Sequence, residues 1–543
     1  MKATKPLVTE SALGQAGGTD AMKWQLPILV CLLAVAALVI RVTDLDRRPM
    51  HADEGVQGLK FIELLENGKY RYDPDEFHGP TLNYLTLPAA WLRGERNRQT
   101  LTETTLRLVP AVFGAGLVLL LLMMSDGLGR PATLSAALIT AISPALVFYS
   151  RYYIHETLLV FFTLAFLGAC WRYLQTKHRG WAVAAGAALG LMHATKETFV
   201  LELFAMAVAL AIVIVTGHKP RNAPGAPGNR AIKIRWPDVG LGLVVAMVVS
   251  VIFYTSFFQY WQGPVDSVLT YFPWLRRAGG ASPHIHPWWF YLERLAFFQR
   301  QSGPAWSEAA LLVLTIAGIG VAIRAGLLPA ANEQLVRFIA IYSIVLAGVY
   351  SAISYKTPWC VLGFYHGFVL LAGVGAAGLL AMCRTKLGRA ACAVVLVALL
   401  GHLGFQTWRA AYAQPADRRN PYVYAHSSPD LLRLVDKVNA IARADPNPDK
   451  FAIQVMAPGG DYWPLPWYFR KYPRTGWWSE IPENPYAPVM VVGAKFHADL
   501  DEKSEKRWLM VGFFESRPGV FFELYVELEL WKKYVETLPR DDD

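Results

Sequence analysis

Stretches of about 20 mostly apolar residues recur along this chain, and no other feature constrains its fold as strongly. Such a stretch is long enough for a helix to cross the hydrocarbon core of a bilayer. The candidate spans are residues 24–42, 104–125, 133–149, 157–173, 181–194, 199–216, 239–260, 309–323, 338–354, 361–382 and 390–412. The sequence therefore predicts a polytopic α-helical membrane protein with about 11 transmembrane helices.

The composition agrees with a membrane protein and excludes two other classes. Hydrophobic residues make up 54% of the chain, charged residues 17%, and the mean hydropathy is +0.28. A soluble domain has about 25% charged residues, so an ordinary soluble enzyme is excluded, and the apolar content excludes a disordered chain. The first stretch is expected to remain as a span and not to be a signal peptide, because Arg41 and a charged loop follow it in place of a small-residue cleavage site.

Basic residues between the spans predict the orientation of the chain. Cytoplasmic loops of membrane proteins carry an excess of Lys and Arg. The basic segments with almost no acid are 172–179, 219–235 and 384–389. If these face the cytoplasm, so does the tail 1–23, and the segments on the outer face are 43–103, 151–156, 193–198, 261–307 and 355–360. We therefore expect an integral membrane protein with a cytoplasmic N-terminus.

Residues 413–543 are more polar than the spans and predict a small extracytoplasmic α/β domain, since an odd number of spans places them on the outer face. The predicted elements are helices at 428–443, 500–511 and 528–538 and strands at 451–456 and 488–492. The segment 461–470 (DYWPLPWYFR) is rich in aromatic residues, which indicates either domain core with an interfacial belt or a platform facing a sugar or lipid. Residues 221–230 (RNAPGAPGNR) predict a flexible cytoplasmic linker.

Charge and cysteine content argue against further classes of site. The net charge of +10 is explained by basic cytoplasmic loops, and the chain has no zinc-finger spacing, P-loop or G-x-G-x-x-G motif after a strand. Nucleic acid is therefore not expected as a partner. None of the five cysteines forms a C-x-x-C pair, so neither a disulfide framework nor a thiolate metal site is expected.

The first outer loop, 43–103, carries a pair of adjacent carboxylates, Asp53 and Glu54. Two short helices, 55–67 and 81–91, are expected to lie along the interface and hold this pair just above the bilayer. One carboxylate of such a pair can accept a proton from an attacking hydroxyl while the other orients it or binds a metal. A low-dielectric site would raise the pKa of one of them. The alternative is a solvated loop with an acidic N-cap on the first helix.

Acidic and histidine side chains on the outer face suggest a divalent metal, Zn²⁺ or Mn²⁺. The candidate ligands are Glu54, His284 and His286, although their spacing matches no recognisable ligand motif. The two histidines lie in a loop rich in Pro and Trp, which could equally cap a cavity.

Several short motifs, in their order and spacing, resemble those of the GT-C superfamily of membrane glycosyltransferases, which includes protein O-mannosyltransferases, aminoarabinose transferases and oligosaccharyltransferase catalytic subunits. The motifs are His51-Ala-Asp-Glu54, Tyr72-Asp-Pro74, Phe77-His-Gly-Pro80, Tyr149-Ser-Arg-Tyr152, His155-Glu156, Ala194-Thr-Lys-Glu-Thr198 and Tyr355-Lys-Thr-Pro-Trp-Cys360. Within about residues 24–480, they resemble more closely a prokaryotic membrane family named for an archaeal flippase-activity-associated protein of glycosylation. The implied architecture is a GT-C-like transmembrane domain at 24–412, with outer loops at 43–103 and 261–307.

The resemblance implies inverting transfer of a sugar from a polyprenyl-phosphate donor to an acceptor lipid, glycan or protein. The usual catalytic base of the superfamily corresponds to Asp53, with Glu54 as its partner, and a second acid corresponds to Glu156, where many members have Asp. Because the leaving phosphate is an anion, cations should face it, or else they contact lipid head groups. The candidate cations are Arg151, Lys196 and Lys356. The expected cavity residues are His51, Tyr72, Asp73, His78, His155 and Trp359.

A non-catalytic flippase-associated or transporter-like protein is the alternative function. A transporter should carry charged or helix-breaking residues near the middle of its spans, often in two related halves. The middles of the candidate spans are nearly bare of charge, no similarity between halves is visible, and Glu202, the main acid in the spans, lies close to an outer end. The sequence therefore favours the enzyme.

Overall fold

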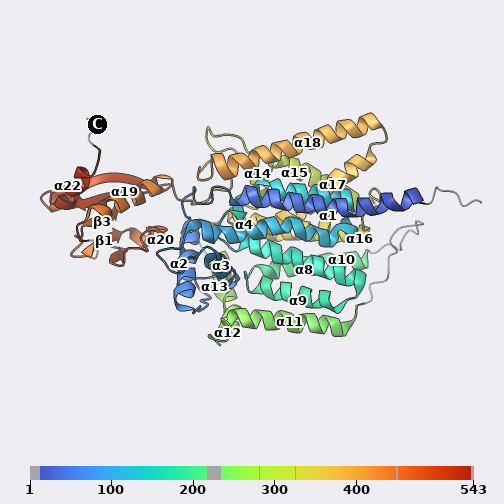
Figure 1. Cartoon of the computed structure of the whole chain (residues 1–543), viewed down its shortest axis with the longest axis horizontal. Coiled ribbons are helices and arrows are strands. Elements are labelled where there is room, and N and C mark those ends of the chain that lie inside the picture. Colours follow the sequence, from blue (N-terminus) through green and yellow to red (C-terminus); the bar gives the residue numbers. More distant parts are fainter. Residues whose placement is uncertain (1–12, 217–233, 280–281, 325, 448–449, 540–543) are drawn as a thin grey trace, which may run out of the picture.

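The computed structural model of the chain is a bundle of long helices with a small α/β domain at one end (Figure 1). The described residues are 13–216, 234–279, 282–324, 326–447 and 450–539. The start of the predicted tail, 1–12, and the predicted linker 221–230 lie outside these residues. We call the end of the bundle that carries the α/β domain the domain end.

The long helices of the bundle run side by side between its two ends (Figure 1). They are α1 (Leu13–Val42), α4 (Glu103–Leu120), α6 (Arg130–Ile142), α7 (Pro144–Ser150), α8 (Glu156–Thr176), α9 (Arg179–His193), α10 (Phe199–Val215), α11 (Trp236–Tyr254), α15 (Ala309–Ile323), α16 (Glu333–Ala352), α17 (Leu362–Met382) and α18 (Lys386–Trp408). Short segments extend them: η2 (Leu121–Met124), α5 (Ser125–Leu128), η3 (Pro358–Val361) and η4 (Arg409–Ala413). The loop helices at the domain end are α2 (Ala52–Asn67), α3 (Thr81–Leu92), α12 (Gly263–Leu269), α13 (Tyr271–Gly279) and α14 (Phe290–Ala296).

Each of the predicted spans coincides with a helix of this bundle. Among the described residues, seven helices are long and apolar enough to cross a membrane, and the pair α6 and α7, bent by 52°, makes an eighth if it counts as one span. The other three, α9, α10 and α15, have 15, 17 and 15 residues. The helical membrane architecture is as predicted, while a count of about eleven spans stays a prediction.

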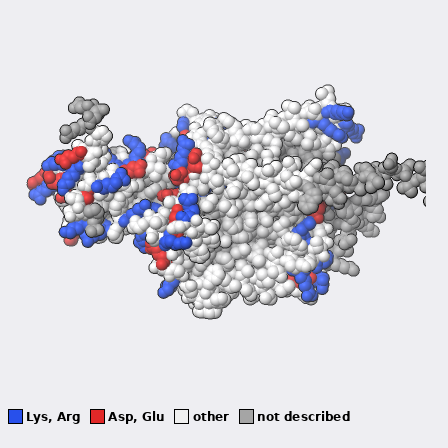
Figure 2. Space-filling view, viewed as in Figure 1, with Lys and Arg blue, Asp and Glu red and all other residues white. Residues whose placement is uncertain are grey.

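The burial of the helices shows which of them form the centre of the bundle. The span that contains α17 is 89% buried, and α17 packs against α15, α6 and α16. By contrast, the spans of α11 and α18 are 6% and 11% buried, so their apolar side chains cover the outside. Charged side chains gather on the α/β domain, at the domain end and at the opposite tip, with a nearly uncharged belt between them (Figure 2). Such a belt is expected of a surface that faces lipid.

The C-terminal domain is built on a five-stranded sheet with the order β2-β1-β3-β5-β4. Its strands are β1 (Ile453–Met456), β2 (Thr475–Trp478), β3 (Val489–Gly493), β4 (Trp508–Arg517) and β5 (Val520–Glu527). Its helical segments are α19 (Asp430–Ala444), η6 (Pro458–Gly460), α20 (Leu465–Tyr468), η7 (Ala494–Phe496), α21 (Leu500–Lys503) and α22 (Leu528–Glu536). Strand β1 is parallel to β2 and β3, with Ile453 opposite Thr475 and Val489, and β5 is antiparallel to β3 and β4.

One predicted element of this domain is wrong. The helix expected at 500–511 is only the short α21, and the chain from Trp508 forms strand β4. Residues 508–514 (WLMVGFF) are rich in aromatic and apolar side chains, which favour a strand when a partner strand is available. Gly519, with φ +80°, closes the turn that brings β5 alongside as that partner. The expected strands at 451–456 and 488–492 and the expected helices at 428–443 and 528–538 are confirmed.

Candidate functional site

The predicted outer segments meet at the domain end, as expected. The first loop and the loop between α9 and α10 are joined by hydrogen bonds from Gly79 N to Thr195 O and from Thr81 N to Ala194 O, each 3.1 Å long. The loop before α17 joins the 261–307 loop through a bond of 2.8 Å from Lys356 N to His284 O. Side chains far apart in sequence therefore surround the start of α2.

The Asp53-Glu54 pair lies in the first turn of α2, where local chemistry separates the two carboxylates. His51 is the N-cap: its Nδ1 accepts from Asp53 N at 3.0 Å, and Glu54 Oε2 accepts from His51 N at 3.0 Å. This reciprocal capping box begins the helix. Successive side chains on a helix point about 100° apart. Glu54 consequently turns into the protein and is fully buried, whereas 51% of the Asp53 side chain is exposed.

Glu54 is held by two arginines. Arg107 of α4 donates from Nε to Oε1 at 2.7 Å and from Nη2 to Oε2 at 2.8 Å, and Arg48 Nη2 lies 3.2 Å from both oxygens. Tyr153 N donates to Oε1 at 3.0 Å. Burial alone would raise the pKa of Glu54, but Arg107 and Arg48 outweigh it and lower the pKa to about 2. Glu54 is therefore ionised at pH 7 and holds the start of α2, which is compatible with the predicted role of a partner that orients Asp53, while its oxygens are occupied by the arginines.

Asp53 is the accessible carboxylate of the pair. In the described part of the chain no hydrogen bond to its carboxylate is found, and its Oδ1 lies 3.7 Å from His51 Nδ1. Because His51 Nδ1 accepts from Asp53 N, the ring carries its proton on Nε2, which faces Tyr424 O at 3.1 Å. Burial lowers the pKa of His51, so the ring is neutral at pH 7. Asp53 is thus free to accept a hydrogen bond from a substrate.

Aromatic rings form a wall beside Asp53. The His51 ring lies edge-on to Tyr152 and Trp359, with centroid distances of 5.4 and 5.7 Å. The Tyr152 ring stacks on His426 at 5.3 Å, and its buried hydroxyl has no hydrogen-bond partner among the described residues. Of the predicted cavity residues, His51 and Trp359 therefore lie together, and Tyr152 and His426 join them.

A second cluster lies in the loops that the Gly79 contact joins. His78 Nδ1 is 2.9 Å from Glu197 Oε2, and its ring lies edge-on to His155 at 5.2 Å. Buried Glu156 forms an ion pair with Lys196. Burial opposes the charge on Lys196, but Glu156 outweighs it and raises the pKa of the ammonium. The predicted second acid and one predicted phosphate ligand are thus each other's partners.

Two further predicted cavity residues shape the first loop. Tyr72 is buried edge-on to Tyr254, with ring centroids 5.0 Å apart. Asp73 Oδ1 accepts from Asp75 N at 3.0 Å, which closes a local turn. Tyr72 and Asp73 therefore each make a contact that stabilises the first loop.

Arg151 binds the end of α1. Its guanidinium donates to the carbonyls of Ile40, Arg41, Thr43 and Asp44 over 2.5–3.2 Å and lies 4.5 Å from the centre of the Tyr412 ring. Carbonyls at a helix C-terminus lack intrahelical partners, and a cation there satisfies them. Arg151 is therefore engaged as a helix cap, so a phosphate at its predicted site would share the guanidinium with these carbonyls.

Lys356, like Arg151 and unlike Lys196, pairs with no carboxylate in the described part of the chain. Its Nζ donates to the carbonyl oxygens of Ile353 and, at 3.2 Å, of His286. The side chain is 1% exposed, and burial lowers the pKa of the ammonium. A buried cation without a counter-ion is a favourable place for an anion to bind.

The predicted metal set is not assembled. His284 Nδ1 and His286 Nε2 both lie 2.9 Å from the Tyr424 hydroxyl, which ties the 261–307 loop to the C-terminal segment. Glu54 is enclosed by its arginines, and in the described ranges no group of three or more His, Cys, Asp or Glu is placed to hold a metal ion. The residues present therefore do not fit the Zn²⁺ or Mn²⁺ site expected from Glu54, His284 and His286.

Arg48, Arg107 and His426 belong to the cluster around Asp53 and were not among the predicted site residues. His426 Nε2 is 3.1 Å from Arg48 Nη1, and burial lowers the pKa of His426, so its ring accepts this bond in the neutral form. Of the three, Arg107 was the easiest to find from the sequence, because it lies inside an apolar span. A charged side chain there is energetically costly in lipid and usually has a specific partner. Arg107 lies near the start of α4, and the expectation of nearly uncharged mid-spans did not consider it.

A glycine permits the loop contact described above. A Cβ atom added at Gly79 would lie 2.1 Å from Ala194 O, far inside contact distance. We expect Gly79→Ala to push the first loop away from the α9–α10 loop and to lower the free energy of unfolding by about 1–3 kcal/mol. Thermal unfolding of the detergent-purified variant measures this, with Gly348→Ala in α16 as the comparison, because the added Cβ there meets nothing within 4 Å and the backbone is helical. An unchanged Gly79→Ala transition would contradict the tight contact.

Comparisons with known proteins place the fold in one superfamily. The profile of the family described as dolichyl-phosphate-mannose-protein mannosyltransferase matches residues 88–220. No curated protein matches the chain by sequence. Among solved structures, ArnT from Cupriavidus metallidurans bound to undecaprenyl phosphate is similar with a TM-score of 0.61 and 16% identity, over 92% of this chain and 98% of that chain.

Two archaeal structures show the same fold. The Archaeoglobus fulgidus oligosaccharyltransferase tethered to an acceptor peptide has a TM-score of 0.53 and 13% identity, over 84% of this chain and 64% of that chain. AglB from the same organism, in complex with an inhibitory peptide and a dolichol-phosphate, has a TM-score of 0.51 and 13% identity, over 94% of this chain and 77% of that chain. The predicted GT-C architecture is thereby confirmed at the level of the fold. The narrower flippase-associated family stays a prediction.

Proposed function

We propose that this GT-C-fold membrane protein is a glycosyltransferase that moves a sugar from a polyprenyl-phosphate donor to an acceptor lipid, glycan or protein, with Asp53 as general base. The observation that carries the proposal is the different environment of the two adjacent carboxylates. Glu54 is enclosed by Arg107 and Arg48, while the Asp53 carboxylate is half exposed. The similar ArnT and AglB structures contain undecaprenyl phosphate and a dolichol-phosphate, which supports a donor of this class.

Asp53 would act on the acceptor. Its carboxylate takes a proton from the acceptor hydroxyl or amine while that atom forms a bond to the anomeric carbon. The bond from the anomeric carbon to the donor phosphate breaks on the opposite face, the phosphate leaves with the electron pair, and the configuration inverts. The capping box and the Glu54 contacts hold α2, and thereby Asp53, in one position for this step.

Lys356 would face the leaving phosphate. Its ammonium donates to two carbonyl oxygens, fewer than the four that hold Arg151, so one N–H remains for an incoming anion. A phosphate at Lys196 would have to compete with Glu156, and one at Arg151 would have to compete with the end of α1. Lys196 and Arg151 remain proposed site residues, but their cationic groups are already bound within the protein. The ammonium of Lys356 is more available to a ligand.

The site would face the extracytoplasmic side of a prokaryotic inner membrane. The basic segments 172–179 and 384–389 lie at the tip opposite the domain end, where Figure 2 shows clustered Lys and Arg. By the positive-inside rule that tip faces the cytoplasm. The C-terminal domain and Asp53 would then lie outside.

We expect Lys356→Met to raise the KM for the donor about 10-fold or more and to lower kcat less, because a hydrogen bond to a charged group contributes about 1.5–3 kcal/mol. The measurement is transfer from a synthetic polyprenyl-phosphate sugar by the purified protein at varied donor concentration. Lys471→Met, at an exposed position of the C-terminal domain, is the matched control. An unaltered donor KM in Lys356→Met would remove this lysine from the site.

A further inference from the structure

The two short helices that follow α11 have their polar side chains inside and their apolar side chains outside. Along α12 and α13, the side chains of Asp266, Ser267 and Thr270 are at most 7% exposed. The apolar side chains of the opposite side are 43–69% exposed, and we call them the apolar face: Val265, Val268, Leu269, Phe272 and Leu275. They recur every three or four residues, and Thr270 between the two helices has helical angles (φ −54°, ψ −25°), so they share one side of the segment.

The polar side of this segment is fixed to the loops of the site. Thr270 Oγ1 donates to Pro74 O of the first loop at 3.0 Å. The Trp274 ring stacks on the His78 ring, with centroids 4.9 Å apart and an angle of 18° between the planes. These contacts hold the segment in one orientation, so the apolar face is directed away from the protein. A contiguous exposed apolar surface of this kind marks a contact with a membrane or a partner.

The apolar face continues a surface that faces lipid. The span of α11 is only 6% buried, and α12 packs against its end at the domain end (Figure 1). The contact is close: a Cβ added at Gly263, the first residue of α12, would lie 1.9 Å from O of Tyr254, the last residue of α11. Phe258 and Trp261 in the connecting turn are exposed, with ring centroids 5.7 Å apart. Exposed aromatic rings beside the end of a span are typical of the boundary between membrane and water.

Cations border the apolar face. Arg276 is exposed directly after Leu275, and the exposed Arg71 of the first loop lies with its guanidinium 5.3 Å from the centre of the Tyr260 ring. Acyl chains can cover the apolar side chains while head-group phosphates pair with such cations. A second protein on this face would also have to displace lipid from the adjoining α11. Phospholipid is therefore the occupant that both the charge and the position of the face favour.

We propose that α12 and α13 lie within the boundary of the membrane leaflet at the domain end and that phospholipid covers their apolar face. The side chains of the apolar face insert among the acyl chains, and Arg276 and Arg71 bind head-group phosphates. Because Thr270 and Trp274 contact the first loop on the other side, the bilayer then fixes the height of that loop relative to the membrane. The proposal concerns membrane contact alone and does not depend on sugar transfer.

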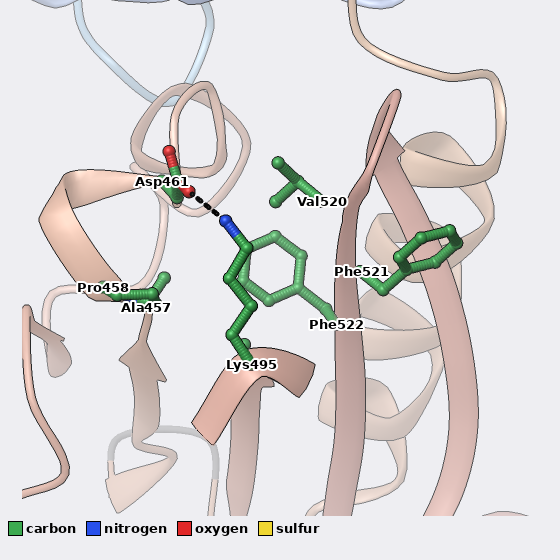
Figure 3. A pocket seen from close by; sticks show the side chains of 8 residues that line it. Ala457, Pro458, Asp461, Lys495, Val520, Phe521 and Phe522 are labelled. Atoms are coloured by element: carbon green, nitrogen blue, oxygen red, sulfur yellow. Dashed lines mark ion pairs between the residues drawn. The ribbon is translucent and has the colours of Figure 1, made fainter. Parts of the chain in front are cut away.

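The test is photo-crosslinking of the full chain in vesicles of phosphatidylcholine and phosphatidylglycerol. The probe is Phe272→p-benzoylphenylalanine, which keeps an aromatic side chain on the apolar face. The matched control is the same replacement at Phe521, an exposed phenylalanine of the C-terminal domain that points away from Asp461 and Lys495 (Figure 3). Val248, exposed on the lipid-facing α11, is the positive reference. By mass spectrometry of the intact protein, we expect a yield of phospholipid adducts at least about 10-fold higher at Phe272 than at Phe521.

A second probe, Val268→p-benzoylphenylalanine, should also form lipid adducts, because it lies on the same face, and thermal unfolding checks that each variant is folded. Lipid yields at Phe272 and Val268 no higher than at Phe521, with adducts formed at Val248, would overturn the proposal. A covalent dimer in place of a lipid adduct would assign the face to a second copy of the chain and would overturn it too. Lipid adducts in a protein that transfers no sugar would leave this proposal standing and count against the proposed function alone.

Discussion

Asp53→Asn is expected to reduce sugar transfer at least about 100-fold while the protein remains folded and inserted in the membrane. Positioned general bases contribute about 10²–10⁴-fold to a rate, and an amide cannot accept the proton that the carboxylate takes. The substitution should leave the fold intact because the Asp53 side chain is half exposed and because the capping contacts of α2 use Asp53 N and Glu54. Transfer from a polyprenyl-phosphate donor by purified protein measures the loss, with thermal unfolding as the check on folding.

The matched control is Asp46→Asn, at an exposed position earlier in the same loop. It removes the same charge from the same segment and should leave transfer within about 2-fold of wild type, because surface substitutions away from special features change little. If Asp53→Asn transferred sugar at more than a tenth of the wild-type rate, Asp53 would not be the base. Equal losses in both variants would indicate a general effect of charge in the loop.

At the domain end, the position of the carboxylate pair could be predicted from the sequence, but the separate roles of the two acids could not. The adjacent carboxylates lie about ten residues beyond the first span and just before the helix predicted at 55–67, which placed Asp53 and Glu54 close to the start of α2. That helix begins earlier than predicted, at Ala52, so the pair lies in its first turn. The separate roles of the two acids depend on the phase of that helix and on Arg107, which is more than 50 residues further along the chain. No local pattern in the first loop indicates which of the two acids Arg107 will bind. The assignment of Glu54 therefore required the tertiary structure.

The same limit explains the differences at the cations and in the C-terminal domain. Arg151 and Lys356 both follow or precede a span and look alike in sequence, but Arg151 lies over the end of α1 and Lys356 does not. Strand β4 was expected to be helical because its apolar residues fit either period, and pairing with β5 decides between them. By contrast, the long apolar helices were predictable one by one, because the bilayer imposes the same length and composition on each of them.

Arg107→Met is expected to lower the free energy of unfolding by about 3–5 kcal/mol, because it removes one partner of a buried ion pair and leaves Glu54 enclosed with Arg48 alone. The pair also makes stability depend on pH. Since the pKa of Glu54 is lowered to about 2 in the folded protein, its contribution is fully present above the ordinary carboxyl pKa of 4.5 and is lost as the pH falls towards 2. Thermal unfolding of wild type and variant at pH 7 and below measures both effects.

The double variant Glu54→Gln with Arg107→Met separates the ion pair from simple loss of contacts. Removing both charges avoids leaving a buried carboxylate with too few partners, so we expect it to recover at least half of the stability lost in Arg107→Met. Arg96→Met, at an exposed position in the first loop, should leave stability unchanged. If the two residues act independently, the double variant will be less stable than Arg107→Met by the full loss of free energy of unfolding measured for Glu54→Gln alone. That result would mean that Glu54 does not depend on Arg107 for its position. Recovery of at least half of the lost stability would mean that Arg107 in α4 helps to position the proposed base, Asp53.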